Sequence, residues 1–242
     1  MADKAMRVSR ALAVAGVASR RAAERLVLEG RVLVNGEPAA IGQLVAPTDR
    51  LEVDGAEVRP EPLRAYLLHK AAGTIASARD PQGRPTVIEG LPEEVRLYPV
   101  GRLDLTTTGA LLVTNDGDLA YGLMHPRSKV PKVYEALVEG RVSAATVRRL
   151  RRGVELEDGP TLPARVEVMR RLHPRATWLE IELTEGRNRQ VRRMCGAVGH
   201  PVMRLHRSRY AGIALGRLRP GEWRPLTGAE LARLAAMVGL ER

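Results

Sequence analysis

The chain has 242 residues, of which 44% are hydrophobic, enough for a medium domain and a small one with a sizeable core. Its formal net charge of +11 favours a polyanionic partner, either a nucleic acid or an acidic membrane surface. The single cysteine, Cys195, excludes an internal disulfide and a multi-cysteine zinc site. Because the sequence has no 18-residue apolar run and no apolar core near its start, we expect a cytoplasmic protein without a membrane segment.

Residues 6–55 are expected to form a small first unit. Ser19 is the predicted cap of a helix that stops at Gly30, and Asn35-Gly36 predicts a tight turn after a strand. The predicted helices and strands of this unit cover residues 7–14, 19–30, 31–35 and 50–53. Residues 56–64 contain two prolines and are predicted to link this unit to a larger domain, residues 65–242.

The larger domain mixes strands and helices without a regular βαβ rhythm, which favours an α+β fold. Apolar residues alternate most clearly in residues 178–183, where Leu179, Ile181 and Leu183 share one face. Strands are predicted at residues 66–70, 110–114, 132–138 and 178–183, and helices at residues 143–152, 191–198 and 227–238.

Basic residues gather in two places. Residues 186–224 contain ten arginines and one acidic residue, and the first 31 residues contain seven basic and three acidic residues. Two separate basic patches favour a partner that spans both domains, as a folded RNA can.

One loop with a candidate catalytic carboxylate remains after common site types are excluded. The sequence has no phosphate-binding loop ending in GK[ST], no G-x-S-x-G elbow and no metal-ligand spacing among its five histidines. Residues 100–109, VGRLDLTTTG, place Asp104 two positions after Arg102 in a loop before an apolar strand. Taken alone, Asp104 is more readily explained as a cap of the following turn than as a catalytic residue, because aspartates in loops are usually structural.

The same loop closely resembles the central motif of the pseudouridine synthases, in particular the branch that modifies small-subunit and large-subunit ribosomal RNA. Three further segments of the larger domain resemble motifs of that branch: LHKAAGTIAS, HPRSKVPKVY and EGRNRQVRRM, at residues 68–77, 125–134 and 185–194. The first unit resembles the αL-type RNA-binding module shared with a small-subunit ribosomal protein and tyrosyl-tRNA synthetases. The resemblance runs in the expected order over nearly the whole chain, and it implies a catalytic domain with a mixed, mainly antiparallel central sheet crossed by the active cleft.

The sequence departs from the family pattern in three places. The first motif usually has Asn-Lys-Pro where this chain has His69-Lys70-Ala71, and Thr106 stands where an acidic residue is usual. There is also no phenylalanine. Each departure affects loop order or substrate fit, and none removes a residue that the resemblance assigns to catalysis.

The resemblance implies a cofactor-free and metal-free isomerisation of uridine. Asp104 would be the nucleophile that attacks the target nucleoside, since a carboxylate is both a fair nucleophile and a good leaving group. Arg192 would pair with Asp104, because a guanidinium favours the ionised carboxylate. Tyr134 would stack on the flipped uracil near the proton to be moved, and Arg102 would hold the flipped-out nucleotide. A core position for Tyr134 and a solvated helix face for the arginines are the simpler alternatives.

A second set of residues is expected to contact RNA. Arg189 and Arg193 are spaced as neighbours on one helical stripe, and Arg192 lies on another, so one stripe can meet phosphate while the other faces the site. The full predicted set is Arg10, Arg20, Arg21, Arg25, Arg31, Asn35, Lys132, Arg189 and Arg193.

The sequence favours 23S large-subunit ribosomal RNA as the substrate, because GRNRQVRR resembles the large-subunit enzymes more closely. A 16S small-subunit enzyme and a non-catalytic ribosomal RNA assembly protein remain alternatives. A nucleoside hydrolase would need a water-activating group that the sequence does not show. A monomer suffices for this chemistry, and both naked RNA and a ribosomal subunit precursor remain open as the substrate.

Overall fold

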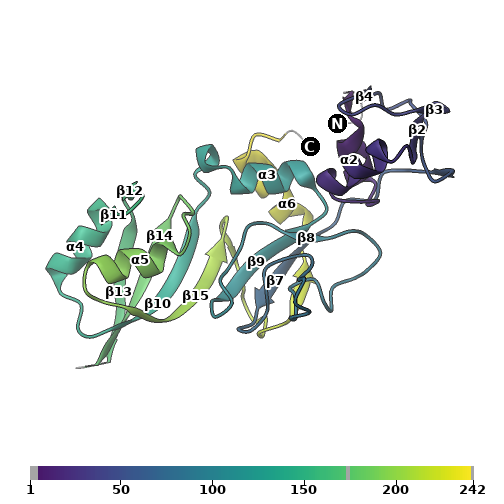
Figure 1. The fold of residues 1–242 in the computed structure, drawn as a ribbon. Coiled ribbons are helices and arrows are strands. Elements are labelled where there is room, and N and C mark those ends of the chain that lie inside the picture. The colour runs from purple at the N-terminus through teal and green to yellow at the C-terminus, as the bar shows by residue number, and fades with distance from the viewer. Residues whose placement is uncertain (1–4, 173–174, 241–242) are drawn as a thin grey trace.

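The computed structural model describes residues 5–172 and 175–240. Its N-terminal module has the two predicted helices packed on short strands (Figure 1). Ser19 caps the second helix by accepting a hydrogen bond from the N–H of Ala22. The elements of the module are β1 (Met6–Arg7), α1 (Val8–Val14), α2 (Arg20–Leu28), β2 (Val32–Val34), β3 (Glu37–Pro38), β4 (Leu44–Val45), β5 (Leu51–Val53) and β6 (Ala56–Glu57).

The module extends further along the chain than expected, because β6 pairs with β5 and occupies the first two residues of the predicted linker. The rest of the linker is held in place. The backbone N–H of Glu61 donates to the carbonyl of Val14, and the Glu61 carboxylate accepts from the backbone N–H of Arg96 at 3.1 Å. Arg10 on α1 donates to both carboxylate oxygens of Asp118 in the larger domain, at 2.7 and 2.6 Å. The linker and this ion pair therefore dock the module onto the larger domain.

The larger domain is built on a nine-stranded sheet with the order β13-β14-β10-β15-β9-β7-β17, to which β16 and β8 add at β15 and β9. All of its strand pairs are antiparallel except β15 with β9, so the predicted α+β fold with a mixed, mainly antiparallel sheet is confirmed. Its strands are β7 (Ala65–Lys70), β8 (Tyr98–Pro99), β9 (Thr108–Thr114), β10 (Lys132–Glu139), β13 (Arg165–Leu172), β14 (Ala176–Leu183), β15 (Val202–Tyr210), β16 (Ile213–Ala214) and β17 (Trp223–Pro225).

Helices and a small hairpin cover this sheet. The helices α4 and α5 lie on β10, β13 and β14, whereas α3 and α6 lie at the β7–β9 side (Figure 1). None of the helices in the described part of the chain is long and apolar enough to cross a membrane. The remaining elements are α3 (Gly117–Met124), the 3-10 helix η1 (Pro126–Ser128), α4 (Ala144–Arg152), β11 (Glu155–Leu156), β12 (Gly159–Pro160), α5 (Gln190–Ala197) and α6 (Gly228–Met237).

Three apolar cores stabilise the larger domain, one of them under α4 and α5. The other two lie on opposite faces of β7 and β9, since alternate residues of a strand point to opposite sides. The side chain of Tyr134 on β10 packs against both the core under α5 and the core beside residues 87–103. Tyr134 therefore marks the place where two cores meet at the middle of the sheet.

The two halves of the sheet meet at the short parallel pairing of β15 with β9. It joins His206 to Thr108 and Arg207 to Gly109. Gly109 has φ +120°, and a Cβ built there would lie 2.3–2.8 Å from the backbone of Arg207. Only glycine fits this position, because both the backbone conformation and the space exclude a side chain.

Candidate active site

Asp104 lies on the loop between β8 and β9, and a buried lysine fixes the backbone of that loop by hydrogen bonds. Lys70, at the end of β7, is fully buried and donates to the carbonyls of Ala71, Leu105 and Thr107 at 2.9, 3.3 and 2.9 Å. Burial lowers the pKa of Lys70 to about 8, and the nearby charge of Asp104 opposes this shift. Lys70 thus fixes the backbone on both sides of Thr106, directly after the carboxylate.

Two arginines approach the Asp104 carboxylate. Arg189 Nη1 lies 3.4 Å from Asp104 Oδ2, and Arg192 Nε lies 3.8 Å from the same oxygen. Arg192 is the less exposed of the two, with 15% of its side chain accessible against 52% for Arg189. Arg192 is also held by hydrogen bonds to the carbonyl of Val202 at 3.1 Å and to Thr106 Oγ1 at 3.3 Å.

The prediction that Arg189 and Arg193 share one face of a helix is wrong. Helix α5 begins at Gln190, and Arg189 is its N-cap in the left-handed conformation, with φ 48°. Its side chain therefore leaves the stripe and reaches Asp104, while Arg193, inside the helix, points to Asp158. Arg189 thus joins Arg192 at the carboxylate instead of extending the stripe of Arg193.

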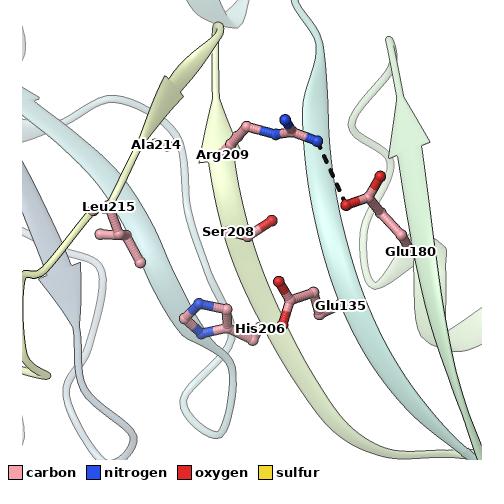
Figure 2. Close-up of a pocket in the computed structure, with 8 residues that line it drawn as sticks. Glu135, Glu180, His206, Ser208, Arg209, Ala214 and Leu215 are labelled. Carbon is pink, nitrogen blue, oxygen red and sulfur yellow. Dashed lines mark hydrogen bonds and ion pairs between the residues drawn. The ribbon is translucent and has the colours of Figure 1, made fainter. Parts of the chain in front are cut away.

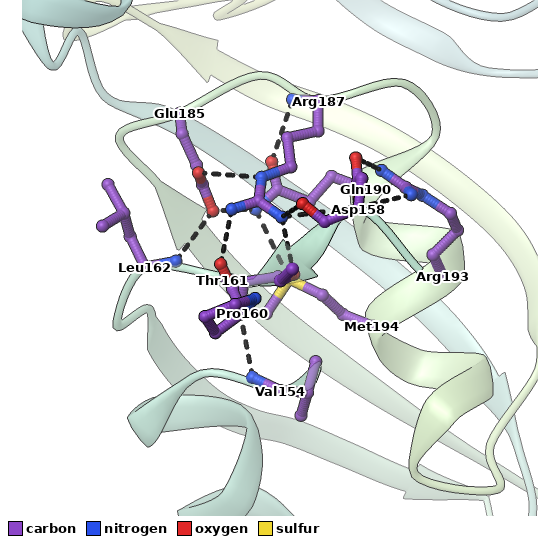
Figure 3. Close-up of polar contacts among 11 residues, drawn as sticks. Val154, Asp158, Pro160, Thr161, Leu162, Glu185, Arg187, Gln190, Arg193 and Met194 are labelled. Carbon is purple, nitrogen blue, oxygen red and sulfur yellow. Dashed lines mark hydrogen bonds and ion pairs between the residues drawn. The ribbon is translucent and has the colours of Figure 1, made fainter. Parts of the chain in front are cut away.

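The loop before α5 is fixed by a polar network centred on Asp158, at the turn between β11 and β12 (Figure 3). Arg193 donates to both oxygens of Asp158, at 2.9 and 3.1 Å. Arg187 donates to the carbonyl of Gly159 at 2.8 Å and forms ion pairs with Asp158 and Glu185. The Glu185 carboxylate also accepts a hydrogen bond from Gln190. The segment that carries Arg189 and Arg192 is therefore anchored at several points.

These elements enclose a pocket with the candidate nucleophile at its edge. Asp104, Leu103 and Thr107 line it from the catalytic loop, and Tyr134 and Leu205 line it from β10 and β15. The loop before α5 and the helix itself form the opposite wall, and Arg102 also lines the pocket. Aliphatic side chains, an aromatic ring and a carboxylate beside two cations suit a flat polar ring as the ligand.

Arg207 on β15 is a buried cation beneath Tyr134 that the sequence analysis did not single out. It is 3% exposed, and its Nε donates to the carbonyl of Ala110 at 2.7 Å. Its guanidinium lies 4.5 Å from the ring centroid of Tyr210 and 6.0 Å from that of Tyr134. Ring faces attract cations, so these two rings stabilise the buried guanidinium of Arg207.

A second hollow lies on β10, β14 and β15 (Figure 2). Glu135, Glu180 and His206 line it, and Arg209 reaches Glu180 at 3.5 Å. Because Glu135 follows Tyr134 in the same strand, the two side chains point to opposite faces of the sheet. The hollow is therefore separate from the pocket at Asp104. Among the residues that the structure describes, no group of three His, Cys, Asp or Glu side chains is placed to hold a metal ion.

Comparison with known proteins identifies the family. The family model for RNA pseudouridylate synthase matches residues 64–197, and the S4 domain model matches residues 6–51. The chain belongs to the RNA pseudouridylate synthase family. The chain is 48% identical to an RNA pseudouridine synthase of Aquifex aeolicus, described as uncharacterized, over 98% of this chain and 96% of that protein. It is also 43% identical to ribosomal large subunit pseudouridine synthase B of Bacillus subtilis, over 96% of each chain.

A solved structure confirms the fold of this family over nearly the whole chain. A crystal structure of a pseudouridylate synthase matches with a TM-score of 0.69 and 28% identity, and the match covers 95% of this chain and 99% of that chain. The predicted N-terminal RNA-binding module and the pseudouridine synthase domain are thus both confirmed. The enzyme is a pseudouridine synthase, and its substrate is RNA.

The structure divides the predicted RNA-contact residues of the module. Arg20, Arg21 and Arg25 on α2 are exposed and form no ion pair with any described residue. Asn35 instead bonds to Asp49 and to the backbone N–H of Arg50, which stabilises the turn that it forms with a positive φ. Arg10 and Arg31 are occupied by the ion pairs Arg10–Asp118 and Arg31–Asp54.

Two predicted contacts of the larger domain are also engaged within the protein. Lys132 donates to the carbonyl of Val130 and lies 5.8 Å from the ring centroid of Tyr210. Burial and the charge of Arg207 lower the pKa of Lys132 to about 8. Arg193 is bound by Asp158, which leaves it less free for phosphate than its place in the sequence indicated. Arg102 remains exposed at the pocket.

Proposed function

We propose that this synthase converts a specific uridine of 23S large-subunit ribosomal RNA to pseudouridine, with Asp104 as the nucleophile. The observation that carries the proposal is the Asp104 carboxylate beside Arg189 and Arg192 at the edge of a pocket that also contains Tyr134. The large-subunit assignment is supported by the name of the Bacillus subtilis relative, which is similar over nearly its full length.

The reaction is an isomerisation, so its bonds balance without a second reactant. Asp104 attacks the nucleoside, at the sugar or the base, and the bond from N1 of uracil to C1′ of ribose breaks. The uracil turns, C5 bonds to C1′, and the bond to Asp104 breaks, which returns its electron pair to the carboxylate. The proton on C5 is then lost while N1 gains one. Tyr134 stacks on the flipped base and lies near the departing proton, and Arg102 grips the extruded nucleotide.

Arg192 and Lys70 position the Asp104 carboxylate and do not themselves react. Arg192 orients the carboxylate, since its guanidinium is fixed by Val202 and Thr106 while its Nε faces Asp104. Lys70 keeps the loop backbone in place. The exposed arginines of α2 bind RNA phosphates away from the reacting uridine. We place the protein in the cytoplasm as a monomer that acts on ribosomal RNA, including RNA within subunit precursors.

The test uses Asp104→Asn and transcripts of both ribosomal RNAs labelled with [5-³H]uridine. Formation of pseudouridine replaces the C5 hydrogen, so released tritium measures the reaction. The wild-type protein should release tritium from the 23S transcript and not from the 16S transcript. Asp104→Asn should abolish release and leave RNA affinity within about twofold, because it removes the nucleophile and little shape. Near-wild-type turnover by Asp104→Asn would exclude it as the nucleophile, and activity on 16S alone would establish the small-subunit alternative.

A further inference from the structure

The helix α3 carries the one exposed aromatic side chain among the seven aromatic residues described. Tyr121 is 65% exposed, whereas the other four tyrosines and both tryptophans are buried or half-buried. Met124, one turn later, is 48% exposed. The opposite side of α3 is buried through Leu119 and Leu123. We call the group of exposed Tyr121, exposed Met124 and half-buried His125 the α3 platform.

The platform is held in a fixed arrangement. The rings of Tyr121 and His125 lie 5.1 Å apart between centroids and are tilted by 51°. His125 Nδ1 accepts a hydrogen bond from the backbone N–H of Arg127 at 3.2 Å, which fixes the orientation of its ring. A scattered exposed hydrophobic side chain is ordinary, but here an aromatic ring is oriented by a second ring that is itself anchored.

The platform lies between the N-terminal module and the catalytic loop. One turn before Tyr121 on the same side of the helix, Asp118 binds Arg10 of the module. At the other end, the Met124 side chain lies 4.0 Å from the place of a Cβ on Gly101, which precedes Arg102 of the catalytic loop. Helix α3 therefore contacts the module at one end and the segment before Asp104 at the other (Figure 1).

The charges around the platform suit an RNA backbone. Arg127 and Lys129 follow it directly and are exposed, and Arg102 lies beyond Gly101. Burial raises the pKa of Tyr98, and the charges of Arg96 and Arg20 oppose this shift. The Tyr98 hydroxyl lies 3.4 Å from the place of a Cβ on Gly117, at the start of α3. An exposed ring flanked by cations is the arrangement that proteins use to stack unpaired bases while they neutralise the neighbouring phosphates.

We propose that the α3 platform is a base-stacking subsite, in which Tyr121 stacks on an unpaired base of the substrate RNA between the module and the flipped uridine. The inference rests on the proposed RNA substrate and extends it to a nucleotide outside the reacting pocket. The ring supplies the binding energy and the tyrosine hydroxyl does not, because stacking needs only the flat face.

The experiment measures single-turnover tritium release with enzyme in excess over the 23S transcript, and gives a rate at saturating enzyme and a half-saturating concentration. Tyr121→Ala should raise the half-saturating concentration about tenfold, the scale of one lost base stack, with the saturating rate within about twofold. Tyr121→Phe should retain wild-type values. Met169→Ala removes a comparably exposed apolar side chain from β13 and should change neither quantity.

Three results would overturn the subsite. Tyr121→Ala with a wild-type half-saturating concentration would show that no base stacks there. A Tyr121→Phe variant as weak as Tyr121→Ala would assign the contact to the hydroxyl. A loss confined to the saturating rate would make Tyr121 part of the chemistry. Thermal melting of each variant confirms folding, and activity of the wild-type protein in the same assay separates failure of this inference from failure of the proposed function.

Discussion

The arginines of the cleft differ from those of the N-terminal module in how they are held. Each of the four arginines in residues 187–193 contacts a carboxylate of the protein, either Asp104, Asp158 or Glu185. The three arginines of α2 point into solvent and have no such partner among the described residues. Both sets lie in the strongly basic parts of the sequence, so charge alone does not separate them.

From this difference we infer different roles for the two sets of arginines. A guanidinium fixed against a carboxylate has lost its freedom before the substrate arrives and can define the geometry of a reaction. A free guanidinium remains available for phosphate and releases counterions when it binds. We therefore expect the cleft set to control the rate and the module set to control RNA affinity and its salt dependence.

Replacement of Arg192 is the strongest test of whether the cleft arginines control the rate. Arg192→Met should lower the single-turnover rate at least about a hundredfold, because it removes a fixed charged group at the nucleophile. Arg192→Lys keeps the charge without the planar fork and should fall between Met and wild type. Arg189→Met is the matched control. It removes the closer but more exposed ion pair, which solvent screens, and should cost about tenfold or less.

Equal losses for Arg189→Met and Arg192→Met would show that burial does not distinguish the two. A larger loss for Arg189→Met would move the principal partner of Asp104 to the helix N-cap.

A pH profile tests whether the catalytic loop needs the charge of Lys70. The pKa of Lys70 is lowered to about 8, so the ammonium is present below pH 8 and is lost as the pH rises through it. The neutral amine has no positive charge toward Asp104 and one fewer hydrogen to donate to the loop carbonyls. The rate at saturating enzyme should therefore fall about tenfold from pH 7 to pH 9, in proportion to the remaining protonated fraction.

Lys132 also has a pKa lowered to about 8 and serves as the control. Lys70→Arg should remove the fall, since arginine stays charged over this range, and Lys132→Arg should retain it. The reverse pattern would assign the pH dependence to Lys132.

The smallest expected effect concerns the module. Replacement of Arg20, Arg21 and Arg25 by Gln should leave the saturating rate within about twofold. It should make the slope of log affinity against log salt shallower by about 2, since each phosphate contact contributes about 0.7–0.9. Arg31→Gln is the matched control because Arg31 is already paired with Asp54. An unchanged slope for the triple variant would contradict the assignment of α2 to phosphate binding.

Much of the fold followed from local signals in the sequence. The caps at Ser19, Ser143 and Thr227 begin helices in the structure as predicted, because each side-chain oxygen accepts a backbone hydrogen bond within the first turn. The central strand β15 was not predicted. Its sequence, VMRLHRSRY, shows no clear alternation of apolar and polar residues, because Arg207 stands at a buried position. Arg207 is stabilised there by an aromatic ring and a backbone carbonyl that only the tertiary structure brings close.

Helix α3 was also not predicted. Asp116 in fact caps the helix by accepting from the N–H groups of Asp118 and Leu119. The resemblance to a family predicted Arg192 beside Asp104, but it indicated neither Arg189 as a second partner nor Asp158 as the partner of Arg193. The left-handed backbone of Arg189 and the reach of Asp158 from a distant hairpin turn depend on tertiary geometry that spacing along the chain does not encode.

The geometry of the active site depends on Gly109, a residue with no side chain, because Gly109 lies where β9 pairs with β15. Asp104 belongs to the half of the sheet that contains β9, whereas Tyr134 and Arg192 belong to the half that contains β10 and α5. The two halves meet at the two residue pairs of β9 and β15, which approach closely because residue 109 has no side chain. The distance from the Asp104 carboxylate to the Tyr134 ring thus depends on how closely β9 and β15 approach each other, and a single methyl group at residue 109 would push these two strands apart.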